Sequence, residues 1–284
     1  MKLSLVFSLI LLNVACVKKT EDPSWIEIKP WILTHNGTNS EGELSYSLKD
    51  AYIMIDNKTI GYFELPIKIP ILMDGIKKID IYPVIRNNGI SATKKVYPFL
   101  ETFSLTSSLI KNKTLEISPS TKYKNNVKFW IENFEEASHK LITDPFYPSV
   151  LSVGNNQELL KYGSQFGQIK LSKKDSIWMG TTSKIELPKN GAEVYLEIDY
   201  IINSDLLSGI VAYDLNNSTE KHPNIQLNKQ KSNSKTWKKI YIDLKEIVSK
   251  SNNAIYFKNY FYTKISAGQD SSMLYLDNIK VVHF

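Results

Sequence analysis

A row of aromatic and basic side chains near the C-terminal end has the composition of a ligand-binding surface. Tyr256, Lys258, Tyr260 and Tyr262 fall on one side of a predicted strand, because side chains alternate between the two faces of a strand. Tyrosine offers an apolar ring with a polar tip, which suits stacking on a sugar ring or docking a protein partner. Trp178 is a further candidate for this surface. Ordinary cross-strand packing is the alternative interpretation.

A group of carboxylates could serve acid and base catalysis. Glu193, Glu197 and Asp199 share one face of the predicted strand 192–202. Glycoside hydrolysis requires two carboxyl groups about 5 to 10 Å apart across the bound sugar. The same pattern is common on any solvated sheet. A hydrolase therefore ranks last among the hypotheses below, no catalytic residue is assigned, and we do not expect an enzyme.

The composition argues against several other classes of site. The four histidines are far apart in the sequence and there is only one cysteine, which argues against a catalytic metal centre. The formal net charge is +6, but the lysines are scattered among acidic residues. Nucleic-acid binding needs a concentrated basic footprint, so no nucleic-acid partner is expected.

The single cysteine, Cys16, directly follows an apolar N-terminal run. That run covers residues 3–12, which suits the apolar part of a secretory signal and is too short to span a bilayer. The small residue Ala15 precedes the cysteine, as a signal peptidase site requires. An exported chain with one cysteine can form no internal disulfide, so the thiol is free for another use.

The stretch Asn13-Val14-Ala15-Cys16 behind this apolar run resembles the lipobox of bacterial lipoproteins, with Asn13 where that family usually has leucine. The resemblance implies a signal peptide over residues 1–15 and acyl chains such as palmitate on Cys16. The lipidated cysteine and the spacer behind it together cover residues 16–24. Each buried acyl CH₂ contributes about 0.8 kcal/mol, and two or more chains anchor a protein stably. The implied location is the outer membrane. The charged residues that follow the cysteine are of mixed sign, so they do not indicate which face of that membrane carries the protein.

Residues 25–123 show strand patterns with a period of two. The segment 50–56 alternates apolar side chains, Asn57 and Lys58 predict a turn, and the chain returns over 59–65. A second pair runs over 78–86 and 90–100, joined at Asn87-Asn88-Gly89, because Asn-Gly readily adopts the positive φ angles of a tight hairpin turn. We expect a small β-sandwich of immunoglobulin-like type, similar to the membrane-proximal modules of many outer-membrane lipoproteins.

Residues 126–284 predict a second sandwich or barrel. Short strand-like runs alternate with polar loops, and a helical pattern covers 245–250. The strand-like runs are 127–136, 172–187, 192–202, 237–244, 254–263 and 272–283.

This second part resembles the galactose-binding-like jelly roll of carbohydrate-binding modules. The resemblance is carried by Asn133-Phe134-Glu135, by 194–200, by 237–244 with its helical sequel, and by Leu276-Asp277-Asn278-Ile279. In many members of that family, a carboxylate in the first strand and one in the last hold a structural calcium ion. The matching positions are Glu135 and Asp277, and two carboxylates supply part of the six to eight oxygens that calcium takes.

The sequence thus predicts an all-β chain, with an immunoglobulin-like N-terminal sandwich followed by a jelly roll, attached to the membrane through Cys16. The leading hypothesis is a non-catalytic accessory subunit of an outer-membrane protein assembly, with a protein partner. The alternative is a surface glycan-binding lipoprotein that uses the tyrosine row. A glycoside hydrolase centred on Glu197 or Asp199 comes third. No cofactor is expected apart from the structural calcium.

Overall fold

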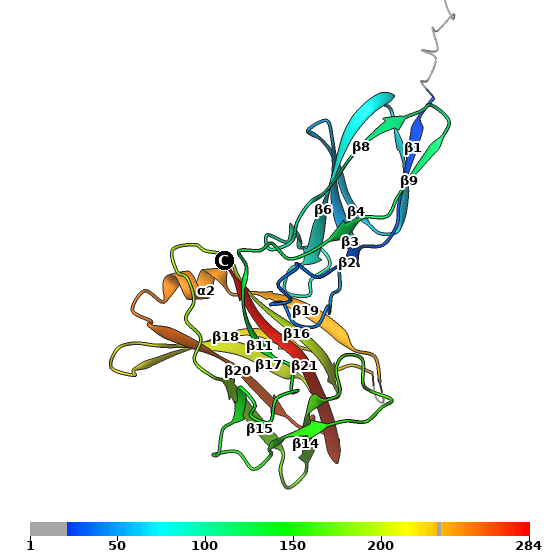
Figure 1. Ribbon diagram of the computed structural model, residues 1–284. Helices are drawn as coiled ribbons and strands as arrows, with labels where there is room; N and C mark the ends of the chain where they lie inside the picture. The colour runs from blue at the N-terminus through cyan, green and yellow to red at the C-terminus, as the bar shows by residue number, and fades with distance from the viewer. Residues whose placement is uncertain (1–21, 232–233) are drawn as a thin grey trace, which may run out of the picture.

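The computed structural model describes residues 22–231 and 234–284, and strands account for most of its secondary structure. Strands hold 52% of the residues and helices 2%, so the predicted all-β class is confirmed. The strands form two sandwiches that follow one another along the chain (Figure 1). In the described part, no helix is both long and apolar enough to cross a bilayer. The predicted signal peptide and Cys16 lie outside the described residues.

The first domain consists of two facing sheets and a small two-stranded sheet. The larger sheet contains β4 (Lys58–Glu64), β3 (Asp50–Ile55), β6 (Gly75–Arg86), β7 (Lys94–Val96) and β8 (Phe103–Leu109). The facing sheet has the order β5 (Ile67–Ile71), β1 (Ser24–Ile28), β9 (Thr114–Ile117), and β2 (Ile32–Leu33) pairs with β10 (Ser120–Thr121). That this sandwich is of the immunoglobulin type stays a prediction.

The two predicted hairpins of the first domain form, with shifted boundaries. β3 buries Ala51, Ile53 and Ile55 as its alternation predicts, but the turn falls on Asp56 and Asn57, which both have positive φ. In the second hairpin, Asn88 and Gly89 have φ of 56° and 74°, as a tight turn requires. The returning strand is only Lys94–Val96, because the chain first closes a wider loop, in which Asn87 donates its backbone N–H to the Thr93 carbonyl.

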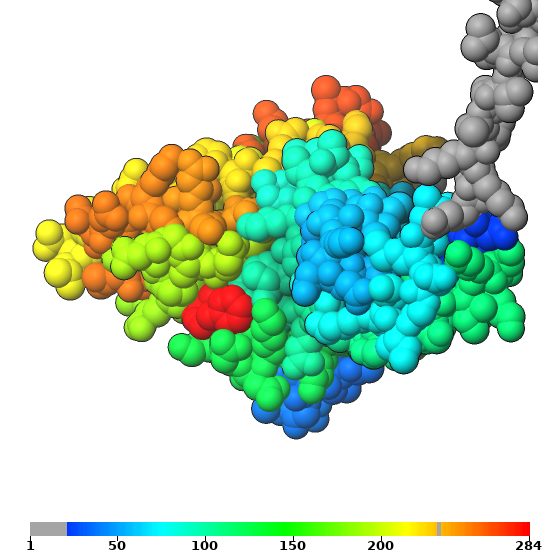
Figure 2. Space-filling view, turned by 90° about the horizontal axis from the view of Figure 1, so that it is seen from above, coloured from blue at the N-terminus to red at the C-terminus, as the bar shows by residue number. Residues whose placement is uncertain are grey.

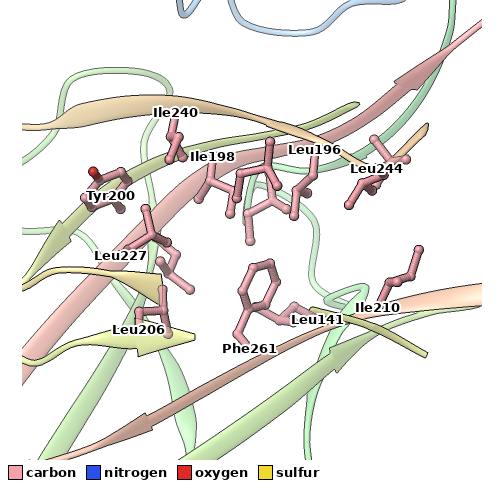
Figure 3. Packing of buried hydrophobic residues seen from close by; sticks show 14 of the residues in the cluster. Leu141, Leu196, Ile198, Tyr200, Leu206, Ile210, Leu227, Ile240, Leu244 and Phe261 are labelled. Carbon is pink, nitrogen blue, oxygen red and sulfur yellow. The ribbon is translucent and has the colours of Figure 1, made fainter. Parts of the chain in front are cut away.

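The second domain is a two-layer sandwich with a core between its sheets (Figure 3). One sheet has the order β13 (Leu151–Gly154), β14 (Phe166–Ser172), β21 (Ser271–His283), β16 (Val194–Ile202), β19 (Lys238–Asp243), and β11 (Lys128–Glu132) also pairs with β21. The other has the order β12 (Leu141–Thr143), β15 (Ile177–Thr182), β20 (Tyr256–Lys264), β17 (Leu206–Tyr213), β18 (Thr219–Leu227). The helix α2 (Lys245–Lys250) falls where the pattern predicts it.

The two domains share one hydrophobic cluster. Tyr195, Tyr241 and Val282 of the second domain belong to the same buried cluster as the core of the first. The Tyr97 ring meets the rings of Tyr195 and Tyr241 edge to face, with centroids 5.3 and 5.1 Å apart. Seen from above, the first domain rests directly on the second (Figure 2). The outer face of the β16, β19 and β21 sheet is therefore partly covered. The opposite sheet contributes no residue to this cluster, and we call it the open sheet, although Tyr256 and Tyr260 on its outer face are only 8% and 1% exposed.

Candidate functional site

The outer face of the open sheet gathers the tyrosines that the sequence singles out. Tyr256, Lys258, Tyr260 and Tyr262 lie on the same side of β20, while Phe257 and Phe261 enter the core. The strand register places Tyr213 of β17 directly opposite Tyr256. Those two rings stack with centroids 4.6 Å apart and an interplanar angle of 14°. We call this surface the tyrosine face, defined by Tyr213, Tyr256, Lys258, Tyr260 and Tyr262.

The Tyr260 ring is seated against the backbone of the neighbouring strand. It lies opposite Gly209, where an added Cβ would come within 2.3 Å of the ring, so only glycine leaves room for it. The ammonium group of Lys221 covers the ring, 4.2 Å from its centroid. The residue is only 1% exposed, and its buried hydroxyl has no hydrogen-bond partner among the described residues. An unpaired buried hydroxyl is costly, and a ligand could satisfy it only if the Lys221 side chain moved off the ring.

Lysine ammonium groups cover other rings of the tyrosine face. Lys184 lies 4.5 Å from the centroid of Tyr256, and Lys258 lies 5.6 Å from that of Tyr213. Burial raises the pKa of the Tyr260 hydroxyl, so it stays protonated and can donate a hydrogen bond at neutral pH. Because lysine side chains are long and rotatable, these ammonium groups can leave the rings without a change in the backbone.

Trp178 does not belong to the tyrosine face. Its side chain is fully buried in the core of the second domain, and its indole N–H donates to Thr143 Oγ1 at 3.1 Å. On β15 it occupies an inward position, and Gly180 leaves space for the ring. The prediction that Trp178 contributes to a binding surface is therefore corrected, because no part of its ring is exposed.

The carboxylates on β16 face the first domain and not solvent. Glu197 is fully buried, and its carboxylate accepts hydrogen bonds from the hydroxyls of Tyr97 at 2.6 Å and Tyr123 at 2.8 Å. Lys239 lies 2.9 Å from the same carboxylate and 3.6 Å from that of Asp199. This arrangement corrects the expectation of a solvated sheet face.

The surroundings of Glu197 also weigh against the hydrolase hypothesis. Burial favours the neutral acid, but Lys239 and Lys280 outweigh it and hold the pKa of Glu197 below its usual range. A general acid for glycoside hydrolysis needs the opposite, a raised pKa. The carboxylate of Glu197 therefore serves the contact between the domains.

Glu135 and Asp277 do not form a ready oxygen shell for calcium. Both oxygens of Glu135 accept hydrogen bonds from the loop at Ser164 and Gln165, at 2.5 to 2.9 Å. Asp277 is buried, and its Oδ1 accepts the backbone N–H of Asn278 at 2.7 Å. Within residues 22–231 and 234–284, no group of three or more His, Cys, Asp or Glu side chains has metal-binding geometry. The calcium ion stays a prediction, which is taken up in the Discussion.

The sequence interpretation missed part of the tyrosine face. Tyr213 and Lys221 lie on β17 and β18, neither of which was predicted as a strand. β17 contains a glycine and a serine, and β18 is mostly polar and has a proline, so both lack a clean alternation. The aromatic residue Tyr213, eleven positions after the end of the predicted strand 192–202, was the available signal.

The comparisons with known proteins do not show the family of this chain. No family model matches the sequence, and no curated protein matches it either. The chain is similar to the family 22 xylan-binding domain of Paenibacillus barcinonensis Xyn10C, with 14% identity, a TM-score of 0.38, and coverage of 54% of this chain and 92% of that one.

Two further solved structures are of the same kind. The family 11 carbohydrate-binding module of Clostridium thermocellum, in complex with a mixed-linked tetrasaccharide, has 10% identity and a TM-score of 0.36, covering 54% of this chain and 94% of that one. A carbohydrate-binding module of the β-sandwich superfamily, described as promiscuous in its specificity, has 13% identity and a TM-score of 0.39, covering 81% of this chain and 83% of that one. These scores assign no ligand to the present chain.

Proposed function

We propose that this chain is a non-catalytic, lipid-anchored glycan-binding protein that uses the tyrosine face of its second domain. The observation that carries the proposal is the Tyr260 hydroxyl, which has no partner among the described residues and lies among other tyrosines. Tyr260 and Tyr256 are only 1% and 8% exposed, with the Lys221 and Lys184 ammonium groups over their rings, so binding requires these lysines to move aside. Aromatic rings stack on the apolar faces of sugars, and a hydroxyl donor in their midst gives directionality.

The arrangement of the domains supports the same proposal. The first domain covers part of one sheet of the second, so the tyrosine face on the opposite sheet is free of that contact. The described chain enters the first domain at the end that points away from the second domain (Figure 1). An anchor at Cys16 would therefore hold the tyrosine face at a distance from the membrane, where it can meet a polysaccharide.

Replacing Tyr260 tests the binding surface. Tyr260→Phe keeps the ring over Gly209 and removes only the hydroxyl, so we expect about a threefold to tenfold weaker Kd for the bound polysaccharide, the value of one hydrogen bond. Tyr260→Ala removes the stacking ring as well and should abolish binding. Retardation in native gels containing a panel of neutral polysaccharides measures both effects.

The control for that experiment is Tyr62→Phe, which alters a half-exposed tyrosine on the first domain. Its retardation should equal that of the unaltered protein. Binding that survives in Tyr260→Ala, or a panel in which no polysaccharide retards the protein, would refute the tyrosine face as a glycan site.

Replacing Cys16 tests the anchor. Cys16→Ser removes the only thiol in the chain, so incorporation of labelled palmitate should disappear and the protein should leave the membrane fraction. Labelling followed by fractionation of the envelope measures both. Unchanged labelling would show that the cysteine carries no lipid, and the membrane location would be lost with it.

The accessory-subunit hypothesis stays a prediction. Nothing in the described residues distinguishes a protein partner for this surface, whereas the unpaired hydroxyl among aromatic rings favours a sugar. We therefore rank the glycan-binding function first and the assembly subunit second, reversing the order that the sequence suggests.

A further inference from the structure

A groove of about 460 Å³ lies where the two domains meet, separate from the tyrosine face. Its floor is the edge strand β19, with Lys238 and Tyr241 among its lining residues. The first domain closes one wall with Tyr46, Lys49 and the turn at Gly89. That turn is fixed against β19, because Asn88 donates its backbone N–H to the Tyr241 carbonyl at 2.8 Å. The groove is thus a product of the docked domains.

The groove carries an excess of positive charge. Lys49, Lys161 and Lys238 line it, and none of them has a carboxylate within ion-pair distance among the described residues. The other charged groups at the groove are already neutralised by neighbours. Arg86 pairs with Asp50 at 2.7 Å and Glu64 at 3.0 Å, and Lys239 pairs with Glu197 and Asp199. Three uncompensated ammonium groups in one concavity attract an anion.

The groove also presents aromatic surface. Trp237 is half-buried, and its indole N–H donates a hydrogen bond to the Leu159 carbonyl at 2.7 Å. Its ring packs against that of Phe166, with centroids 6.0 Å apart. These contacts fix the indole while leaving part of it in the groove. Tyr46 is 37% exposed and is held by a hydrogen bond from its hydroxyl to the Trp31 carbonyl at 3.1 Å. Fixed rings of this kind suit stacking against a sugar.

We propose that this groove binds an acidic oligosaccharide whose sugar rings carry carboxylates, as in a chain of uronic acids. The three lysines come from three separate segments, Lys49 before β3, Lys161 between β13 and β14, and Lys238 on β19, which fits an anion with charges spaced along a chain better than one compact phosphate. The aromatic rings add a contact that a simple anion cannot use. This site is independent of the tyrosine face, since the two surfaces share no residue.

Titration with hexagalacturonate, measured by calorimetry at low and at physiological salt, tests the proposal. The unaltered protein should bind, and binding should weaken as salt rises. The double variant Lys49→Gln/Lys238→Gln should lose at least about tenfold in affinity, because two charged contacts disappear. Lys113→Gln alters an exposed lysine just before β9, outside the groove, and should leave the affinity unchanged.

Two further measurements separate this site from others. The change in tryptophan fluorescence on binding should vanish in Trp237→Phe, and Tyr260→Phe should bind hexagalacturonate normally even if it loses neutral glycans. Absence of hexagalacturonate binding, or equal binding by the double lysine variant, would overturn the proposal. Single-stranded DNA is the comparison ligand. If it bound as tightly as hexagalacturonate and lost as much affinity in the double lysine variant, the proposal would also be overturned, because the groove would then select for charge alone.

Discussion

Glu197→Gln is expected to destabilise the protein by about 3–5 kcal/mol, the usual cost of removing one partner from a buried charge network. The carboxylate of Glu197 is fully buried and accepts from two tyrosine hydroxyls of the first domain. Without its charge, Lys239 keeps only Asp199, at 3.6 Å, as a counterion. Equilibrium unfolding in urea, followed by tryptophan fluorescence, measures the loss.

Glu193→Gln provides a matched control on the same side of the second domain. Glu193 keeps 22% of its side chain exposed and pairs with Lys95 at 3.0 Å and Lys245 at 2.9 Å. A partly solvated pair of this kind contributes about 1 kcal/mol or less. Adding Lys239→Met to Glu197→Gln should not recover the loss, because the buried carboxylate of Asp199 would then lose its ion pair with Lys239. Equal, small losses in both glutamate variants would mean that water reaches Glu197 as it does Glu193.

Local patterns were sufficient to predict much of the second domain. β16 and β19 fall within the predicted runs, β20 and β21 each extend one residue beyond theirs, and α2 has the predicted bounds. The alternation along β20 also placed its tyrosines and phenylalanines on the correct faces, because side chains in a strand must alternate. Such signals depend only on neighbours in the sequence, so they can be recognised without knowing the fold.

What covers each sheet face could not be predicted in the same way. The Glu197 and Asp199 side of β16 looks the same in sequence whether water or another domain lies against it. The contact depends on partners far along the chain, such as Tyr97, Tyr123 and Ser45. The groove lined by Lys49 and Lys238 depends on the same docking. A tyrosine between the acidic residues, Tyr195, was the one hint that this face is buried.

Lys280 is a buried charged residue at the junction of the two domains. Its ammonium group is fully buried and donates to the carbonyls of Glu41 and Glu43, at 2.5 and 2.6 Å, on the first domain. Burial, with the charge of Lys239, lowers the pKa of Lys280 to about 8. The junction therefore combines apolar packing with charges that are paired or hydrogen-bonded, which favours one relative arrangement of the domains.

Asp277→Asn is expected to make the protein more stable above neutral pH. Burial, together with the nearby charge of Asp199 on the adjacent strand, raises the pKa of Asp277 from 3.8 to about 8. Between these values the folded protein binds a proton that the unfolded chain has released. The stability contributed by this group is therefore full below about pH 4 and is lost as pH rises toward 8, by about 1.4 kcal/mol per pH unit.

The asparagine variant mimics the protonated acid at every pH, so this decline should be absent from it. Urea unfolding of both proteins from pH 4 to 9, with EDTA present, gives the difference curve that isolates Asp277. A repeat with calcium tests the predicted ion, because calcium at this carboxylate would stabilise its charged form and flatten the decline in the unaltered protein only. Parallel curves for the two proteins in EDTA would contradict the raised pKa, since Asp277 would then be ionised in the folded and unfolded states alike.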